Sequence, residues 1–217
     1  MSGSIISPEL RANVRRLMTP IAVGLGRLGL SPNALTVIGF LIAVAAAVFA
    51  GVGAWLVAGL LVIFGGVFDL FDGALARATN QVSRVGGFMD STFDRWSEGV
   101  VYVGIAAGGQ AAGVDPVAIL SAAAMASAFM VSYTRAKAES LGFAPGTGMA
   151  NVGLAPREVR LLILTVGLVW SGIAGVGATG AGGVVLEASL ALIAALATIT
   201  TIQRIAATLR QARALDG

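Results

Sequence analysis

Residues 28–68 read LGLSPNALTVIGFLIAVAAAVFAGVGAWLVAGLLVIFGGVF, a run of 41 residues without one charged side chain. A helix needs about 20 mostly apolar residues to cross the hydrocarbon core of a bilayer, so this run is long enough for two crossings. Gly51-Val52-Gly53 divides it near the middle, and such glycine pairs favour tight turns. The run therefore predicts two membrane-spanning helices joined by a short turn.

The composition of the whole chain agrees with a membrane location. Of 217 residues, 57% are hydrophobic and only 12% are charged, with a mean hydropathy of +0.89. A soluble domain carries roughly 25% charged residues, so an ordinary soluble globule is excluded. The chain also has no His and no Cys. Zinc and haem sites, cysteine nucleophiles, disulfides and histidine bases are therefore excluded, which leaves carboxylates, cations, hydroxyls and hard metal ions for any chemistry.

Further charge-free stretches at 99–114, 116–134, 161–186 and 188–203 extend the pattern. We predict one membrane domain over residues 1–217, an all-α integral membrane protein with six transmembrane helices. The expected spans are about 34–50, 54–78, 86–108, 115–138, 157–176 and 184–208. Residues 8–27 mix arginine with apolar residues at helical spacing, which favours an amphipathic helix along the headgroups over a frayed basic leader or a cleavable signal peptide.

Basic residues set the expected orientation. The turns near 51–53, 109–114 and 177–183 contain no Lys or Arg, whereas all basic residues except Arg95 lie at the other ends of the predicted spans. Cytoplasmic segments are enriched in Lys and Arg. We therefore expect a multi-pass protein of the plasma membrane with both termini, and the active site, on the cytoplasmic side.

Four aspartates lie near the cytoplasmic ends of the second and third predicted spans: Asp69, Asp72, Asp90 and Asp94. Each ionisable residue inside a span costs at least ~2.5–3.5 kcal/mol and is a functional candidate by default. The first two are spaced i,i+3 and the last two i,i+4, so each pair shares a helix face. The pairs are nearly equidistant from the intervening turn, which predicts that all four meet at one depth.

Four converging carboxylates repel one another unless cations neutralise them. Without His or Cys, this donor set indicates hard ions, Mg²⁺ or Mn²⁺, and two of them. Two other interpretations remain open: the ion or proton path of a transporter, and ion pairing with Arg77 and Arg95.

Written out, residues 69–94 read DLFDGALARATNQVSRVGGFMDSTFD. This stretch matches D-x2-D-G-x2-A-R-x8-G-x3-D-x3-D, and so resembles the signature of the CDP-alcohol phosphotransferase family. The six-span layout is similar to that family's membrane domain. The resemblance implies transfer of a substituted phosphate from a CDP-linked lipid to an alcohol, with release of CMP, two divalent metals and a homodimer.

The resemblance also implies roles for individual residues. Asp69, Asp72 and Asp90 match metal ligands. Asp94 matches the general base, and we expect it to be a metal ligand as well. The positions expected to bind the cytidine nucleotide of CDP-diacylglycerol are Gly73, Arg77, Ser83 and the element Ser31, Pro32, Asn33 and Ala34. For that last element an ordinary helix start remains an alternative, because Ser is a common N-cap and Pro a common first helical residue.

Cations at the same cytoplasmic level indicate a site for an anionic second substrate: Arg135, Lys137, Arg157 and Arg204. Such a cluster favours a phosphorylated acceptor, either inositol phosphate or glycerol 3-phosphate. The stretch SYTRAKAE at 132–139 and the Gly/Ala-rich composition resemble the actinobacterial phosphatidylinositol phosphate synthases of this family.

That resemblance implies inositol 1-phosphate as the acceptor and CDP-diacylglycerol as the donor. The alternatives are synthesis of phosphatidylglycerophosphate or cardiolipin and, from another class of protein, a small ion-coupled transporter. Membrane lipid is an expected partner, and nucleic acid is not.

Overall fold

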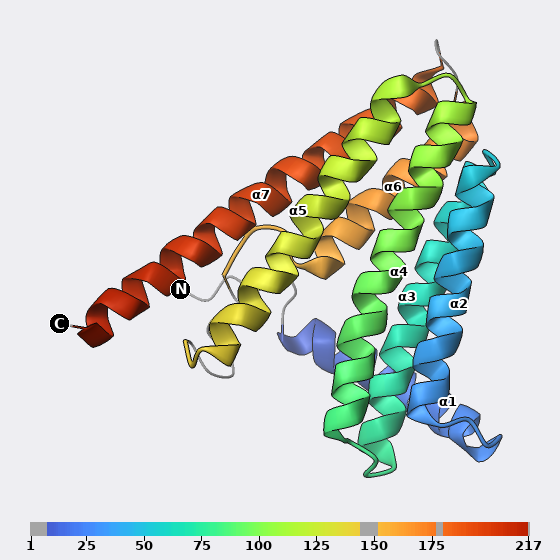
Figure 1. Ribbon diagram of the computed structural model, residues 1–217. Coiled ribbons are helices and arrows are strands. Elements are labelled where there is room, and N and C mark those ends of the chain that lie inside the picture. The colour runs from blue at the N-terminus through green and yellow to red at the C-terminus, as the bar shows by residue number, and fades with distance from the viewer. Residues whose placement is uncertain (1–7, 144–151, 177–179, 217) are drawn as a thin grey trace.

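The computed structural model describes residues 8–143, 152–176 and 180–216, and the regular structure within these ranges is helical (Figure 1). The helices, in chain order, are α1 (Pro8–Arg27), α2 (Pro32–Gly51), α3 (Trp55–Ala78), α4 (Arg84–Ala111), α5 (Asp115–Ser140), α6 (Arg157–Ala174) and α7 (Ala181–Asp216).

These helices confirm the all-helical prediction, and each predicted segment falls on one helix. The largest difference is at α7, which continues to Asp216 rather than ending near 208. Residues 205–216 contain Ala, Leu, Arg and Gln but no Gly or Pro, so strong helix formers extend the helix past the apolar segment.

By length and composition, four of the described helices are long and apolar enough to cross a membrane: α2, α3, α5 and α7. Six were expected, and the two missing ones are α4 and α6. Their charged residues explain the difference, because the inner part of α4 contains Asp94, Arg95 and Glu98, and α6 begins with Arg157, Glu158 and Arg160. The two helices that are not apolar enough to cross a membrane by this measure, α4 and α6, are thus those with charged residues in the middle of the bundle.

The helices form two groups that meet at one end and separate at the other (Figure 1). In the first group, α2 packs against both α3 and α4; in the second, α7 packs against α5 and α6. The groups are joined by contacts of α3 with α6 and of α4 with α5. Helix α2 thus makes the extensive contacts with both of the helices that carry the four aspartates.

Glycines permit the close approach of α2 and α4. A side chain at Gly104 would collide with the backbone of Ala47, and one at Gly108 with the backbone of Ala50. Small residues allow helix backbones to approach in this way in membrane proteins. The apolar core then continues through Trp55, Tyr102 and residues of α6 and α7.

Helix α1 lies across the ends of α2, α3 and α4, at the end of the bundle where the two groups separate (Figure 1). It packs on α3, with Ala22 fully buried in a small cluster that includes Leu75. Leu17 and Ile21, in contrast, are exposed. This division into a packed face and an exposed apolar face agrees with the amphipathic character expected of this segment.

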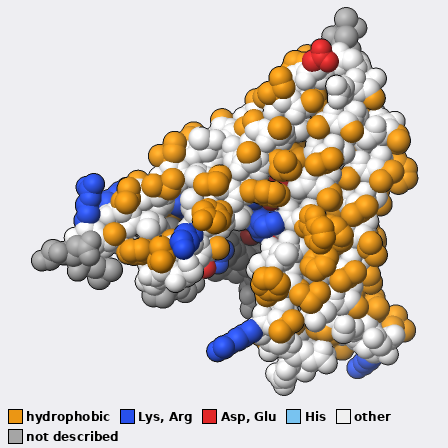
Figure 2. Space-filling model, viewed as in Figure 1, with side chains coloured by type: hydrophobic (Ala, Val, Ile, Leu, Met, Phe, Trp, Pro, Cys, Tyr) orange, Lys and Arg blue, Asp and Glu red, His pale blue; other side chains and the backbone are white. Residues whose placement is uncertain are grey.

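Figure 2 shows that hydrophobic side chains are spread over the whole length of the visible face and that Lys and Arg gather near the separated ends of the two groups. The surface is hollowed between the groups there, and basic side chains lie in the hollow (Figure 2). The predicted aspartates and cations lie on the helices that border this hollow.

Candidate active site

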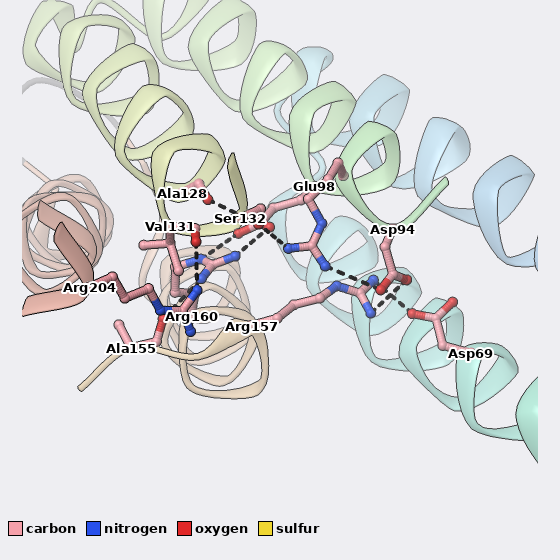
Figure 3. Close-up of polar contacts among 11 residues, drawn as sticks. Asp69, Asp94, Glu98, Ala128, Val131, Ser132, Ala155, Arg157, Arg160 and Arg204 are labelled. Atoms are coloured by element: carbon pink, nitrogen blue, oxygen red, sulfur yellow. Dashed lines mark hydrogen bonds and ion pairs between the residues drawn. The ribbon is translucent and has the colours of Figure 1, made fainter. Parts of the chain in front are cut away.

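Two aspartates from different helices are bridged by one arginine (Figure 3). Nη2 of Arg157, at the start of α6, lies 2.7 Å from Oδ2 of Asp69 on α3, and its Nη1 lies 2.8 Å from Oδ1 of Asp94 on α4. All three side chains are between 16% and 21% exposed. The guanidinium therefore occupies a place between carboxylates that favours a cation.

The other two aspartates complete the acidic cluster. Asp72 is buried and accepts a 2.6 Å hydrogen bond from Oγ1 of Thr36 on α2. It is repelled by the charges of Asp90 and Asp69, while Asp94 is repelled by Asp69 and repels Asp90. Each carboxylate thus interacts electrostatically with another across the α3–α4 pair.

Within the described residues, no group of three or more acidic side chains is arranged to hold a metal ion. The contacts explain this arrangement, because Arg157 stands between Asp69 and Asp94 and Thr36 holds Asp72. The chemistry of the cluster nevertheless fits a hard divalent cation, since its donors are carboxylate oxygens only and a cationic group already neutralises two of them.

The residues expected to contact the nucleotide lie at the starts of α2 and α4 and, for Gly73 and Arg77, in the last turns of α3. Ser31 caps α2 by accepting a hydrogen bond from the amide of Ala34, 3.1 Å away, and Pro32 follows as the first helical residue. Ser83 caps α4 in the same way, accepting from the amide of Gly86 at 3.0 Å. Both serines therefore have a structural role as N-caps.

Two glycines keep space open near these caps. A Cβ at Gly86 would lie 3.1 Å from Oγ of Ser83 and 3.5 Å from Oδ1 of Asn33, so the starts of α2 and α4 are close together. A Cβ at Gly73 would lie 3.2 Å from Nη1 of Arg77, whose guanidinium folds back over that glycine. Ser31–Ala34, Gly73, Arg77 and Ser83 thus border the same end of the first helix group.

The four expected acceptor cations differ in their surroundings. Arg204 of α7 is only 4% exposed, and it donates to the carbonyls of Val131, at 2.6 Å, and Val152, at 3.0 Å. Arg135 is exposed and pairs with Glu139 at 2.9 Å, and Lys137 is exposed. Arg204 and Arg135 lie close enough to repel each other electrostatically. Arg157, in contrast, lies among the aspartates.

Ion pairing of the aspartates was one of the open interpretations, with Arg77 and Arg95 as partners. Arg95 does pair with Asp94, at 3.3 Å, and it also donates to Oγ of Ser132 on α5. Arg77 lies over Gly73 instead. The strongest partner is Arg157, which sequence reasoning assigned only to the acceptor.

Sequence reasoning also missed a buried ion pair next to this cluster. Glu98 and Arg160 are fully buried and joined by two hydrogen bonds of 2.8 Å (Figure 3). The signal for Glu98 was present, because it continues the i,i+4 series of Asp90 and Asp94. Arg160 was attributed to topology alone, and its partner lies 62 residues away in the sequence.

Comparison with known proteins identifies the family. The family description "CDP-alcohol phosphatidyltransferase" matches residues 29–203, most of the chain. The chain belongs to this family. It is therefore a CDP-alcohol phosphotransferase, an enzyme of phospholipid synthesis, and the transporter interpretation is wrong.

Similar proteins include inositol phosphate synthases from two domains of life. The archaetidylinositol phosphate synthase of Pyrococcus horikoshii is 34% identical over 197 residues, which cover 91% of this chain and 93% of that protein. The phosphatidylinositol phosphate synthase of Streptomyces avermitilis is 35% identical over 220 residues, covering 98% of this chain and 86% of that protein.

A crystal structure of the phosphatidylinositol phosphate synthase of Mycobacterium tuberculosis with CDP-DAG bound is similar in fold. It is 31% identical, with a TM-score of 0.77, and the match covers 89% of this chain and 94% of that chain. The same enzyme was also solved with manganese and citrate. These matches confirm a multi-pass membrane protein of a metal-dependent family.

Proposed function

We propose that this enzyme transfers the phosphatidyl group of CDP-diacylglycerol to the hydroxyl of inositol 1-phosphate, giving phosphatidylinositol phosphate and CMP. The observation that carries the proposal is Arg204, a buried cation with no carboxylate at ion-pair distance among the described residues. A buried charge is costly unless it is paired, so a site of this kind favours an anionic ligand. The similar proteins named above are inositol phosphate synthases, which supports this acceptor.

The acidic cluster is proposed to hold two divalent ions, Mg²⁺ or Mn²⁺, through Asp69, Asp72, Asp90 and Asp94. When bound, such ions supply charge neutralisation at the attacked phosphate and its leaving group. The manganese in the mycobacterial structure supports this proposal. Arg157 would then be released from Asp69 and Asp94, since the same oxygens cannot serve both cations fully.

The donor nucleotide is proposed to lie where the ends of α2, α3 and α4 meet. Gly73 and Gly86 leave room for close approach of a ligand, and Arg77 places a positive charge beside that space. Ser31–Ala34 and Ser83 form the two helix starts, whose amide groups favour a phosphate. The lipid chains of the donor would extend beside the apolar helices.

The acceptor is proposed to bind through its phosphate to Arg135, Lys137, Arg157 and Arg204. Arg157 lies beside Asp94 in the structure, so a phosphate held by the released guanidinium would bring the acceptor hydroxyl near that carboxylate. Asp94 would accept the hydroxyl proton, and the oxygen would displace CMP from the phosphorus in a single step. Arginine binds phosphate in a bidentate way that a neutral alcohol cannot match, which favours a phosphorylated acceptor over free inositol.

The site is proposed to face the cytoplasm of a single plasma-membrane domain that spans residues 1–217. Six crossings, α2 to α7, and an interfacial α1 would place both termini on the side where Lys and Arg gather, as positive-inside topology requires (Figure 1). Arg157 and Arg160 of α6, like the charges of α4, would then face the protein interior rather than lipid. A homodimer is part of the same proposal.

The test is CMP release by the purified protein with CDP-diacylglycerol and Mg²⁺ or Mn²⁺, with three acceptors offered in parallel. We expect release with inositol 1-phosphate and little with glycerol 3-phosphate or free inositol. Release with glycerol 3-phosphate instead would contradict the proposed acceptor but keep the donor and the metals. Release that is unchanged by a chelator would contradict the metal site.

A further inference from the structure

Two parallel connections join α4 to α6 (Figure 3). The outer one is the contact of Asp94 with Arg157, at 2.8 Å. The inner one is the pair of Glu98 and Arg160, in which Nε and Nη2 of the arginine each lie 2.8 Å from one carboxylate oxygen. On both helices the inner residue lies one turn deeper than the outer one, so the two connections lie on the same helix faces.

Burying the ion pair of Glu98 and Arg160 costs free energy. Both side chains are 0% exposed, and removing two charges from water often costs as much as their attraction returns. Apolar residues of similar volume frequently give equal or greater stability at such positions. Stability alone therefore gives no reason for an ion pair here. Its distinctive property is geometry, because a planar, two-bond contact fixes the rotation of one helix against another.

The segment before α6 is held by the same arginine. Nη1 of Arg160 donates to the carbonyl of Ala155 at 2.9 Å, and the amide of Ala155 donates to Oγ1 of Thr200 on α7 at 2.9 Å. Leu154 donates to the same hydroxyl at 3.0 Å. The entry into α6 is thus fixed from α4 and α7 together, immediately before Arg157.

The position of Arg157 must be defined closely, because its guanidinium contacts two helices at once. One nitrogen pairs with Asp69 of α3 and the other with Asp94 of α4. Functional groups must be held within ~0.5 Å of the productive geometry, and rigid supporting contacts provide that. A small rotation of α6 would move the guanidinium away from one of the two carboxylates.

We propose that Glu98 and Arg160 are positioning residues of the transfer site, which set the rotation of α6 so that Arg157 reaches the acidic cluster and the acceptor phosphate. This inference rests on the proposed function, since it takes Arg157 as a phosphate-binding residue. Glu98 and Arg160 touch neither substrate; they act through Arg157.

The test replaces the pair as a unit, because either single replacement would leave an unpaired buried charge and strongly destabilise the protein. In the double variant Glu98→Leu/Arg160→Met, we expect the melting temperature to stay near that of the native enzyme. The KM for inositol 1-phosphate should rise at least tenfold, with the KM for CDP-diacylglycerol unchanged. Ser121→Ala is the matched control, since Ser121 is buried on α5 and its hydroxyl lacks a partner among the described residues.

Combining the pair with Arg157→Ala separates positioning from general damage. If the pair acts through Arg157, adding Glu98→Leu/Arg160→Met to Arg157→Ala should weaken the acceptor no further. Calorimetric binding of inositol 1-phosphate without the donor gives the same comparison independently of turnover. We expect tenfold weaker binding in the double variant and in Arg157→Ala, and no further loss in the triple variant.

Three outcomes overturn the inference, and they are distinguishable. An unchanged acceptor KM in Glu98→Leu/Arg160→Met, with an effect of Arg157→Ala, refutes the positioning role and leaves the proposed function intact. Additive losses, or equal losses for donor and acceptor, show general disruption instead. No effect of Arg157→Ala removes the proposed acceptor contact and this inference with it.

Discussion

The acidic and the cationic sides of the site are built in different ways. The acidic side comes from one pair of consecutive helices, with its four aspartates within residues 69–94. The cationic side comes from three helices, with residues between 135 and 204. The first side is set by helical periodicity and one short turn, whereas the second depends on how α5, α6 and α7 pack together.

This difference has a chemical counterpart. In the proposed reaction the aspartates would hold the metal ions and supply the base, and both functions would be needed whatever the acceptor. The cations would decide which alcohol is used. A change on the acidic side should therefore stop turnover with every acceptor, and a change on the cationic side should alter the acceptor KM alone.

The largest effect is expected on the acidic side, from Asp94→Asn. An amide cannot accept the acceptor proton, and loss of a general base costs ~10²–10⁴-fold in rate. We expect CMP release to fall about 1000-fold. Binding of CDP-diacylglycerol should persist, because the residues proposed to bind its nucleotide do not include Asp94.

Asp115→Asn is the matched control for that variant, since Asp115 is exposed in the first turn of α5, at the opposite end of the bundle. The Asp115→Asn variant should release CMP at the rate of the native enzyme. Near-normal turnover of Asp94→Asn would remove Asp94 from the role of base and leave the acidic side with metal binding alone.

A smaller, selective effect is expected on the cationic side, from Arg204→Ala. A hydrogen bond to a charged group is worth ~1.5–3 kcal/mol, so the KM for inositol 1-phosphate should rise on the order of 30-fold. The KM for CDP-diacylglycerol should not change. Arg210→Ala, on the same helix but with an exposed arginine, should leave both constants unchanged. Equal losses for both substrates in Arg204→Ala would contradict the division between the two sides.

The fold was predictable because it depends on long charge-free runs. Gly51-Val52-Gly53 marked the first turn, and α2 and α3 lie on either side of it. The sequence did not predict that α2 packs against both α3 and α4. That contact relies on Gly104 and Gly108 meeting the backbone of α2, and glycines in an apolar helix do not say which neighbour approaches them.

Within the site, too, local features were predictable from the sequence and contacts between distant helices were not. The face shared by the aspartates followed from their spacing, but their partners did not, because Arg157 reaches Asp69 and Asp94 from a helix far along the chain. Glu98 and Arg160 were missed for the same reason. The contact of Thr36 with Asp72 was missed too, because Thr36 follows the predicted nucleotide element on another helix, 36 residues from its partner.

The smallest of the three effects is expected from Thr36→Val, which tests whether the acidic side can be changed without touching the cationic one. Valine keeps the shape of threonine but removes the donor to Oδ2 of Asp72, which lies 2.6 Å away. Partners of metal ligands contribute ~10–100-fold to metal affinity, so the Mn²⁺ concentration for half-maximal CMP release should rise about tenfold. Thr36→Ser should restore it, and Thr208→Val, which removes only a bond to a helix carbonyl, should have no effect. Because the hydroxyl of Thr36 contacts Asp72 and the carbonyl of Pro32 rather than an acceptor cation, the KM for inositol 1-phosphate at saturating Mn²⁺ should stay unchanged. A rise in that constant would show that the two sides are coupled through α2.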